Sequence, residues 1–577
     1  MNFKSLISFF AFMGAIVSMD SCGGKDNPNN KPITTDTTTV YTSINGTQIA
    51  NTNNLIGLIK NTKTGKGIAG IPVSDGYSFT VTDNNGVYQM KGNIYARKVF
   101  YTKPEGYETE LNGRHAPSFY SASNVKNNGQ TRTDFSLTPI SASDDEWTLF
   151  ALSDPQCRSD ANVSRFTSET IPDLVSYAST GKASGTVKNP IAITLGDIIF
   201  DNLAEWVPMQ KALSNIKLTD GSYLPIYNCI GNHDHNNAEN SDYNCVKNFV
   251  NYFGPTDYSF DIGQAHIVVM DDVMYKGSTT GSTYNNIDYD GGFTDTQYRW
   301  LQADMANVSD PANKLLIMCF HIPFRDGVTS GGSSINKTAH YADFLKLMTN
   351  FHEAHIMIGH THYPQNYIHT DYVCKGGKPV YEHILGATCG AWWSCNSNVE
   401  GSPNMYGVFQ IKGNSIVDDV MKPTLKADSY QLMVFDGGQV YKGETGYVHN
   451  NPYKWGMSAS ASQGSDVSKY AGYFIAKIWN SDDKYWSVNL VVDGKSYPME
   501  RVSGSIMNSS SAAFYYNMLG KTTTTYMKTG LDYYVAKAPN GDPATEKDWK
   551  VVATQQIPGG VSHTYVSAML QTDYGAY

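Results

Sequence analysis

Strand-like and helix-like segments alternate through the middle of the chain, and this alternation constrains the fold more than any other feature of the sequence. Short apolar runs typical of buried strands are separated by stretches whose apolar residues recur at helical spacing. Strands that alternate with helices indicate βαβ units and an α/β core. The expected strands are Trp147–Ser153, Ile191–Leu195, Leu224–Ile230, His266–Met270, Leu315–Phe320 and His355–Ile358, and the expected helices are Ala161–Ser179, Leu203–Ile216, Cys245–Phe253, Thr294–Met305 and Thr338–Asn350.

The segments on either side of this core show a β-type pattern instead. Between residues 46 and 140, short strand-like runs alternate with turn signals, which predicts a small antiparallel β-sandwich. Strand-like runs return beyond residue 400, starting with Tyr406–Ile411. A chain of 577 residues allows about three or four domains at roughly 150 residues each. We expect an N-terminal β-sandwich at 46–140, an α/β domain at 145–400 and a C-terminal β-rich domain at 401–577.

The N-terminal residues 1–22 have the pattern of a secretory leader. Lys4 precedes an apolar stretch from Leu6 to Val17, and small residues follow near a cleavage point. Cys22 resembles the lipidated cysteine of bacterial lipoproteins, and the polar residues 23–45 are typical of a tether. We expect an exported protein of the bacterial cell envelope that is anchored to the membrane only through a lipid on Cys22. Plain secretion, with Cys22 removed or free, is the alternative.

Bulk composition narrows the class of protein. The formal net charge is −10, and a broad electrostatic grip on nucleic acid needs a basic surface, so a nucleic-acid-binding protein is disfavoured. The eight cysteines are irregularly spaced and include no C-x-x-C pair. They form no recognisable disulfide framework, and we expect most of them to be buried apolar residues.

Five of the expected strands end in side chains that commonly bind metal ions. Because ligands bind at the carboxyl ends of strands in open α/β sheets, we expect these side chains to meet in one crevice. They offer carboxylate, amide and imidazole groups and no thiolate, which suits divalent ions such as Mn, Fe or Zn. The candidate metal ligands are Asp154, Gln156, Asp197, Asn232, His321, His360 and His362.

In this order the blocks resemble the calcineurin-like metallophosphoesterases, whose pattern is D-x-H, G-D, G-N-H-D/E, a lone H and G-H-x-H. The departure is Gln156, where the family pattern has histidine; an amide oxygen binds a borderline metal more weakly than imidazole does. A D-P-Q block also resembles a subgroup of the family, so we do not interpret Gln156 as inactivating. The blocks read Asp154-Pro155-Gln156, Gly196-Asp197, Gly231-Asn232-His233-Asp234, His321 and Gly359-His360-Thr361-His362.

The resemblance implies a four-layer α/β sandwich between two β domains, and a centre of two metal ions that share Asp197. It further implies that a metal-bridging hydroxide attacks phosphorus directly, without a phosphoenzyme. His233 would act as general acid or as electrostatic aid to the leaving group, and Asp234 would orient its ring. The first metal would take Asp154, Gln156, Asp197 and His362, and the second would take Asp197, Asn232, His321 and His360.

Several further residues carry open alternatives. Trp392 and Trp393 form either an apolar wall for a substrate group or a packing contact with the next domain, and Arg325 is a candidate for holding a phosphate oxygen. Asp201 either supports the site or caps the next helix, and the cap is favoured.

The sequence leaves two hypotheses for the function. The favoured one is hydrolysis of a phosphate mono- or diester, either a small molecule or a phosphorylated surface component. The alternative is a surface lipoprotein that binds a glycan or a cell-surface partner and keeps a vestigial metal site.

Overall fold

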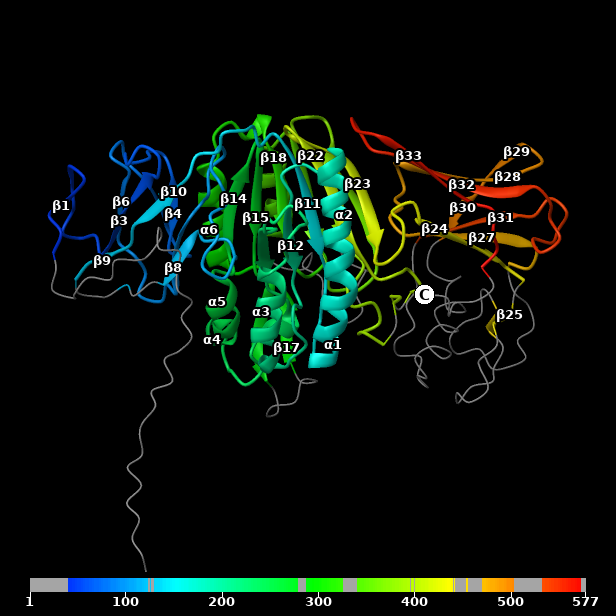
Figure 1. Cartoon of the computed structure of the whole chain (residues 1–577), viewed down its shortest axis with the longest axis horizontal. Coiled ribbons are helices and arrows are strands. Elements are labelled where there is room, and N and C mark those ends of the chain that lie inside the picture. Colours follow the sequence, from blue (N-terminus) through cyan, green and yellow to red (C-terminus); the bar gives the residue numbers. More distant parts are fainter. Residues whose placement is uncertain are drawn as a thin grey trace, which may run out of the picture.

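Three parts lie side by side along the longest axis of the molecule: an N-terminal β-sandwich, an α/β core and a C-terminal β-sandwich (Figure 1). The core lies between the two sandwiches, so each of them contacts the core on a different side. The structure is a computed structural model, and it describes residues 40–122, 125, 129–278, 287–324, 340–394, 396–398, 400–438, 440–441, 453–454, 470–502 and 532–571.

Two sheets form the core. In each sheet a run of consecutive strands is parallel, as the alternating pattern predicts, and β22, β23, β14 and β20 join these runs in antiparallel pairs. The five-stranded sheet contains, in spatial order, β13 (Ile226–Cys229), β12 (Ile191–Leu195), β11 (Glu146–Leu152), β22 (Met405–Lys412) and β23 (Ser415–Pro423). The six-stranded sheet contains β14 (Tyr258–Ile262), β15 (Ala265–Val269), β18 (Leu315–Cys319), β19 (Glu353–Ile358), β21 (Pro379–Ile384) and β20 (Gln365–Val373).

Helices cover the outer faces of both sheets, which gives the four layers that the resemblance implies. Along β11, Leu149 and Ala151 pack between the two sheets, whereas Phe150 and Leu152 pack against the helices. Burial on both faces explains why these strands read as unbroken apolar runs. The helices are α1 (Asp160–Arg165) and α2 (Ile171–Ser184), joined by a π-helical turn at Phe166–Thr170, then α3 (Trp206–Ser214), α4 (Asp242–Cys245), α5 (Lys247–Phe253), α6 (Asp295–Ala306) and α7 (Tyr341–Met348).

The N-terminal domain is a sandwich of two four-stranded sheets. In the first sheet, the central strand β3 pairs in parallel with β9 and β10, so the expectation of a purely antiparallel sandwich is wrong. Parallel pairing needs a long crossover connection, which strand-and-turn patterning does not reveal. The first sheet contains β3 (Leu55–Asn61), β6 (Val87–Met90), β9 (Thr131–Arg132) and β10 (Phe135–Leu137); the second contains β5 (Phe79–Val81), β4 (Pro72–Ser74), β7 (Lys98–Tyr101) and β8 (Tyr120–Ala122); β1 (Ser43–Ile44) and β2 (Thr47–Gln48) form a separate ribbon.

The C-terminal domain is also a sandwich of two four-stranded sheets. Apolar side chains of both sheets, among them Phe474 and Leu490, form its own core. The sheets are β24 (Leu432–Asp436), β27 (Tyr473–Ile478), β31 (Tyr533–Lys537) and β30 (Glu500–Val502), and β29 (Lys495–Pro498), β28 (Trp486–Val492), β32 (Trp549–Gln556) and β33 (Ser562–Ser567). Two short ribbons lie outside these sheets: β16 (Val273–Ser278) with β17 (Ile287–Gly291), and β25 (Val440–Tyr441) with β26 (Tyr453–Lys454).

Sheet pairing carries the core past the expected boundary at residue 401. The sequence pattern predicts that Tyr406–Ile411 belongs to the C-terminal domain, but the run lies in β22, which pairs along its length with β11. The adjoining β23 pairs with β22, so the chain leaves the core only after Pro423. A β-type pattern shows that a strand is present and does not show which sheet it joins, which is the reason for the difference.

Both flanking domains form backbone hydrogen bonds with edge strands of the core. The amide of Asp261 in β14 donates to the carbonyl of Lys103 in the N-terminal domain, at 2.7 Å. The amide of Val561, next to β33, donates to the carbonyl of Val417 in β23, at 3.0 Å. Edge strands otherwise present unpaired backbone groups, so these contacts satisfy part of both edges.

The six cysteines that the structure describes are buried free thiols, as expected: Cys157, Cys229, Cys245, Cys319, Cys374 and Cys389. The predicted leader, Cys22 and most of the tether lie outside the described residues, and so does Cys395. Among the helices of the described segments, none is both long and apolar enough to cross a membrane.

A buried imidazole between two carboxylates ties α6 to the six-stranded sheet. His266 Nδ1 lies 2.7 Å from Asp261 Oδ1, and its Nε2 lies 2.9 Å from Asp304 Oδ2 on α6. Burial alone would lower the pKa of His266, but Asp304 and Asp261 raise it to about 10. The charged form of His266 therefore stabilises the fold. This contribution is fully present below the unfolded pKa near 6.5 and is lost as pH rises towards 10.

We predict that His266→Gln lowers the free energy of unfolding by about 3 kcal/mol at pH 6, because it leaves the buried Asp304 and the partly buried Asp261 without their cation. The deficit relative to the wild type should shrink as pH rises from 6.5 towards 10, which urea unfolding at both ends of this range measures. The control is His340→Gln, which removes a pair with the exposed Asp295 and should cost less than about 1 kcal/mol. A deficit that grows with pH would contradict the assignment.

Candidate metal centre

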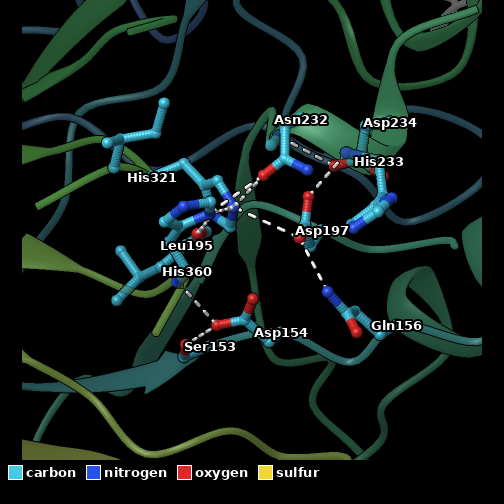
Figure 2. Close-up of polar contacts among 12 residues, drawn as sticks. Ser153, Asp154, Gln156, Leu195, Asp197, Asn232, His233, Asp234, His321 and His360 are labelled. Atoms are coloured by element: carbon cyan, nitrogen blue, oxygen red, sulfur yellow. Dashed lines mark hydrogen bonds and ion pairs between the residues drawn. The ribbon is translucent and has the colours of Figure 1, made fainter. Parts of the chain in front are cut away.

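The candidate ligands converge at the carboxyl ends of strands from both core sheets (Figure 2). β11, β12 and β13 lead into Asp154, Asp197 and Asn232, and β18 and β19 lead into His321 and His360. All seven predicted ligands are buried. The structure therefore brings the whole predicted set together, across the ends of two sheets and not of one.

The turns that carry these ligands have unusual backbone conformations. Among the described residues, sixteen other than glycine have a positive φ, and eight of them lie at this site. Such angles are strained for residues with a Cβ and cluster at functional sites. The eight are Asp154, Gln156, Asp197, Asp201, His360, His362, Trp392 and Trp393.

Two glycines of the motif blocks allow these turns to approach each other. A Cβ on Gly231 would lie 2.2 Å from the amide nitrogen of Asp197, and a Cβ on Gly359 would lie 2.5 Å from Asp154 Oδ2. Both distances are shorter than atoms can tolerate. The glycines of the G-N-H-D and G-H-x-H blocks are therefore required by close packing of the ligand turns.

In the half of the site that would hold the second metal, ligand atoms of several residues surround His321. The Nδ1 of His321 lies 2.8 Å from the carbonyl of Leu195, which fixes the tautomer that leaves Nε2 as the ligating atom. This Nε2 lies 3.2 Å from Asp197 Oδ2, 3.1 Å from Asn232 Oδ1 and 3.2 Å from His360 Nδ1. Atoms that attract a cation thus face one another at short distances.

The electrostatics of this half favour a positive charge. Burial alone would lower the pKa of His321, but Asp197 raises it to about 10. Burial, followed by His321, lowers the pKa of His360 to about 3, which keeps that imidazole neutral and able to act as a ligand. One positive charge is therefore stabilised at a place where several acceptors meet.

The other half contains buried atoms that lack a hydrogen-bond partner among the described residues: Asp154 Oδ1, Gln156 Oε1 and His362 Nδ1. His362 Nε2 lies 3.4 Å from Asp154 Oδ1. The Nε2 of Gln156 donates to Asp197 Oδ2 at 2.7 Å, so its amide reaches the shared carboxylate. Buried polar atoms without partners are costly, and a bound cation would satisfy them.

These residues fit two metal ions. Ligand atoms of Asp197, His321 and His360 lie within 4.8 Å of one another, and the same holds for Asp154, Asp197 and His362. Asp197 belongs to both groups, as the resemblance implies. Gln156 and Asn232 contact these groups and complete the two predicted ligand sets.

The partner of His233 differs from the prediction. His233 Nδ1 lies 3.0 Å from Asp201 Oδ1, not from Asp234. Asp234 instead accepts the backbone amides of Ile198, Ile199 and Gly231, so it ties the turn after β12 to the turn after β13. The assignment of Asp234 to the ring of His233 is wrong, because its carboxylate is fully engaged with backbone donors.

Asp201 is correspondingly not the expected helix cap. The next helical turn begins one residue later, where Asn202 accepts from the amide of Ala204. The positive φ of Asp201 turns its side chain back, and Asn237 Nδ2 also donates to Asp201 Oδ1 at 2.9 Å. Asp201 lies four residues after Asp197 in the sequence, but the sequence does not indicate its left-handed backbone conformation.

The two tryptophans named as candidates for substrate contact occupy different environments. Trp393 is buried and its indole Nε1 donates to the carbonyl of Pro155 at 2.8 Å, so it packs in the core. The ring of Trp392 lies 5.1 Å from that of His362, at the metal site. Arg325 lies outside the described residues.

Comparison with known proteins identifies the family. Residues 152–364, which contain every candidate ligand, match the model of the calcineurin-like phosphoesterases. Residues 54–140 and 382–557 match the models of the N-terminal and C-terminal parts of the same family. The chain belongs to the calcineurin-like phosphoesterases. This membership supports a hydrolase, and it covers the two flanking domains as well as the core.

Solved structures resemble the chain only distantly, and no curated protein matches it. A dimetal phosphatase from Danio rerio is 13% identical, with 48% of this chain and 96% of that chain covered and a TM-score of 0.32. A purple acid phosphatase from yellow lupin (Lupinus luteus) seeds is 13% identical, covering 61% and 68%, with a TM-score of 0.31. A Haemophilus influenzae NAD nucleotidase is 10% identical, covering 48% and 49%, with a TM-score of 0.24. Likeness at this level supports no conclusion about this chain.

We predict that Gln156→His retains or tightens metal binding, because imidazole binds a borderline metal more strongly than an amide oxygen. Gln156→Leu is the matched variant, because leucine is of similar size and has no atom that can bind a metal. It should weaken binding by at least the ~10–100-fold typical of losing a supporting partner. Metal analysis of the purified proteins and competition with a chelator measure both. A clear loss of metal in Gln156→His would show that Gln156 is not a ligand.

Proposed function

We propose that the protein hydrolyses phosphate mono- or diesters with a centre of two divalent metal ions. The observation that carries the proposal is the position of Asp197, whose carboxylate belongs to two groups of buried ligand atoms at once. Family membership supports the phosphoester class. The donor set of carboxylates, amides and imidazoles suits Mn, Fe or Zn. Bound there, two divalent ions would outweigh the charges of Asp154 and Asp197, attract a phosphate group and lower the pKa of a bound water.

The residues of the chain hold this site in place before any substrate arrives. Asp197 Oδ1 accepts the backbone amide of His233 at 2.8 Å, which fixes the position of that residue beside the ligands. Ser153 Oγ and the amide of His360, at 3.0 Å, both donate to Asp154 Oδ2. Such preorganisation lowers the cost of reaching the transition state, because few groups need to move.

His233 is proposed as the group that gives a proton to the leaving oxygen. Its side chain is 21% exposed, so a substrate can reach it, whereas that of Asp201 is only 3% exposed. Burial opposes the charged form of His233, but Asp197 and Asp201 raise its pKa above the ordinary value. Nδ1–H of His233 donates to Asp201, so in the charged ring Nε2 carries the proton that can be transferred.

The choice between monoester and diester depends on loops and flanking domains, because the ligand set serves both. Export and a lipid on Cys22 remain proposals from the sequence, and they would place the enzyme in the cell envelope with a small phosphoester or a phosphorylated surface component as substrate. A surface-binding protein with a vestigial site remains the alternative. Metal at two ions per chain together with turnover would exclude it, and a pure protein with neither would favour it.

We predict that Asp197→Asn and His360→Ala abolish hydrolysis of 4-nitrophenyl phosphate and bis(4-nitrophenyl) phosphate, because each removes a ligand atom from the buried set. Circular dichroism should stay unchanged. His563→Ala is the control, since it removes a histidine of β33 that pairs with Asp418 of β23 and belongs to neither ligand set. Activity near that of the wild type in either ligand variant would refute the proposed mechanism.

We further predict that Asp201→Asn lowers kcat by about 10–100-fold with metal content unchanged, because the ring of His233 loses its orienting carboxylate. Asp220→Asn is the matched control, since Asp220 pairs with Lys182 at the surface. Steady-state kinetics and metal analysis of the same samples give the result. An unchanged kcat would exclude Asp201 from the mechanism.

A further inference from the structure

Two consecutive tryptophans adopt left-handed backbone conformations beside the metal centre. Trp392 has a φ of 48° and Trp393 a φ of 61°. Bulky residues avoid this region unless the surrounding structure holds them there. The segment follows the last ligand block, and the amide of Cys389 donates to the carbonyl of Asp154 at 3.3 Å. The loop is thus attached to the ligand turns themselves.

Trp393 anchors the loop from the side of the helices. It is 5% exposed, its indole reaches Pro155 between two ligands, and its ring centroid lies 6.2 Å from that of Phe166. Arg165 at the end of α1 donates to the carbonyl of Trp393 and to the side chain of Asn396. Glu169, 2.6 Å from Arg165, orients the guanidinium.

The C-terminal domain holds the same loop from the other side. The carboxylate of Glu400 accepts the amide of Ser402 at 3.2 Å and lies 3.5 Å from Lys477 of β27, with both charges buried. The hydroxyl of Tyr533 in β31 donates to the carbonyl of Glu400 at 3.4 Å. The loop is therefore fixed by α1 at one end and by the C-terminal sandwich at the other.

This arrangement leaves Trp392 half-buried, with its ring beside His362. Trp393 supplies a fully buried contact, whereas Trp392 packs against the core with only part of its side chain and leaves the rest accessible. Tyr289 of β17 lies edge-on to His360, at 6.4 Å between centroids. Each histidine of the last ligand block thus has an aromatic neighbour. Ligand sites combine a few polar groups with apolar, often aromatic, walls.

We propose that Trp392 is a specificity-determining residue that binds a flat aromatic leaving group of the phosphoester, with Arg165 as a positioning residue that acts through the loop. The inference rests on the proposed function and narrows its substrate class. An indole face adds stacking to the burial of apolar surface, and an alkyl leaving group gains little from it. Aromatic esters should therefore bind more tightly than alkyl esters that carry the same phosphate charge.

The test compares the binding of phenylphosphonate and methylphosphonate to the full chain loaded with Mn²⁺, by titration calorimetry, so it does not depend on turnover. The wild type should prefer phenylphosphonate by about tenfold. Trp392→Ala should reduce this preference to less than about twofold, Trp392→Phe should keep most of it and Arg165→Lys should reduce it in part. Tyr95→Ala, which truncates a ring that is 60% exposed in the N-terminal domain, should match the wild type.

The outcomes are separable. Equal affinity of the wild type for the two phosphonates, or an unchanged preference in Trp392→Ala, would overturn the role of Trp392 and leave the proposed function standing. If neither phosphonate binds the metal-loaded wild type, the result counts against the proposed function instead. If Trp392→Ala does not fold, Trp392→Gln keeps a side chain at this half-exposed position and should also lose the preference.

Discussion

The structure depends on one constraint, which is that ligand atoms from the ends of five strands are held close together in two overlapping buried groups that share Asp197. Asp197 stands at the centre of this arrangement, because its oxygens contact His233, Gln156 and His321 at once. Such a set repels itself unless positive charge is present, so the folded chain has to force the strand ends together. The two sheets, which are apolar on both faces, provide that force through burial.

The cost of this arrangement is visible in the backbone. Left-handed residues other than glycine cost about 1–3 kcal/mol each, and half of those described lie at this site. Carboxylates without a direct chemical role offset part of the cost. Asp234 joins two ligand turns through three backbone amides, and Asp272 accepts the amides of His321 and Ile322. These residues stabilise the position of the ligands and belong to neither predicted ligand set.

Sequence patterns predicted the parts of the fold that follow from local periodicity. The alternating strands and helices of the core are present where apolar spacing indicated them, and the ordered blocks predicted that all seven ligands meet. The patterns failed where the answer depends on tertiary pairing. They placed Tyr406–Ile411 in the C-terminal domain, although it pairs with β11, and they did not indicate β20 or β21.

The role of Asp201 shows the same limit at the level of one side chain. An aspartate before a helical stretch is a good capping candidate, and only the left-handed φ of 58° directs it to His233 instead. The prediction for Asp234 is wrong because the motif does not show its contacts in space. Its carboxylate accepts the backbone amides of Ile198 and Ile199 from another turn. Motif spacing identifies which residues gather, and the backbone decides which of them touch.

The segment that contains the metal ligands is shorter than the segment that forms the two core sheets. The segment 152–364 that matches the catalytic family model contains every ligand, yet it ends before β20, β21, β22 and β23 and omits nearly all of β11. A fragment cut at those limits would keep only two strands of the five-stranded sheet. It would also expose the edge of β14, where the N-terminal sandwich now forms a backbone hydrogen bond. A shortened chain that keeps both core sheets therefore has to run from β11 through β23, and it covers the edge of β14 only if it also retains the N-terminal sandwich.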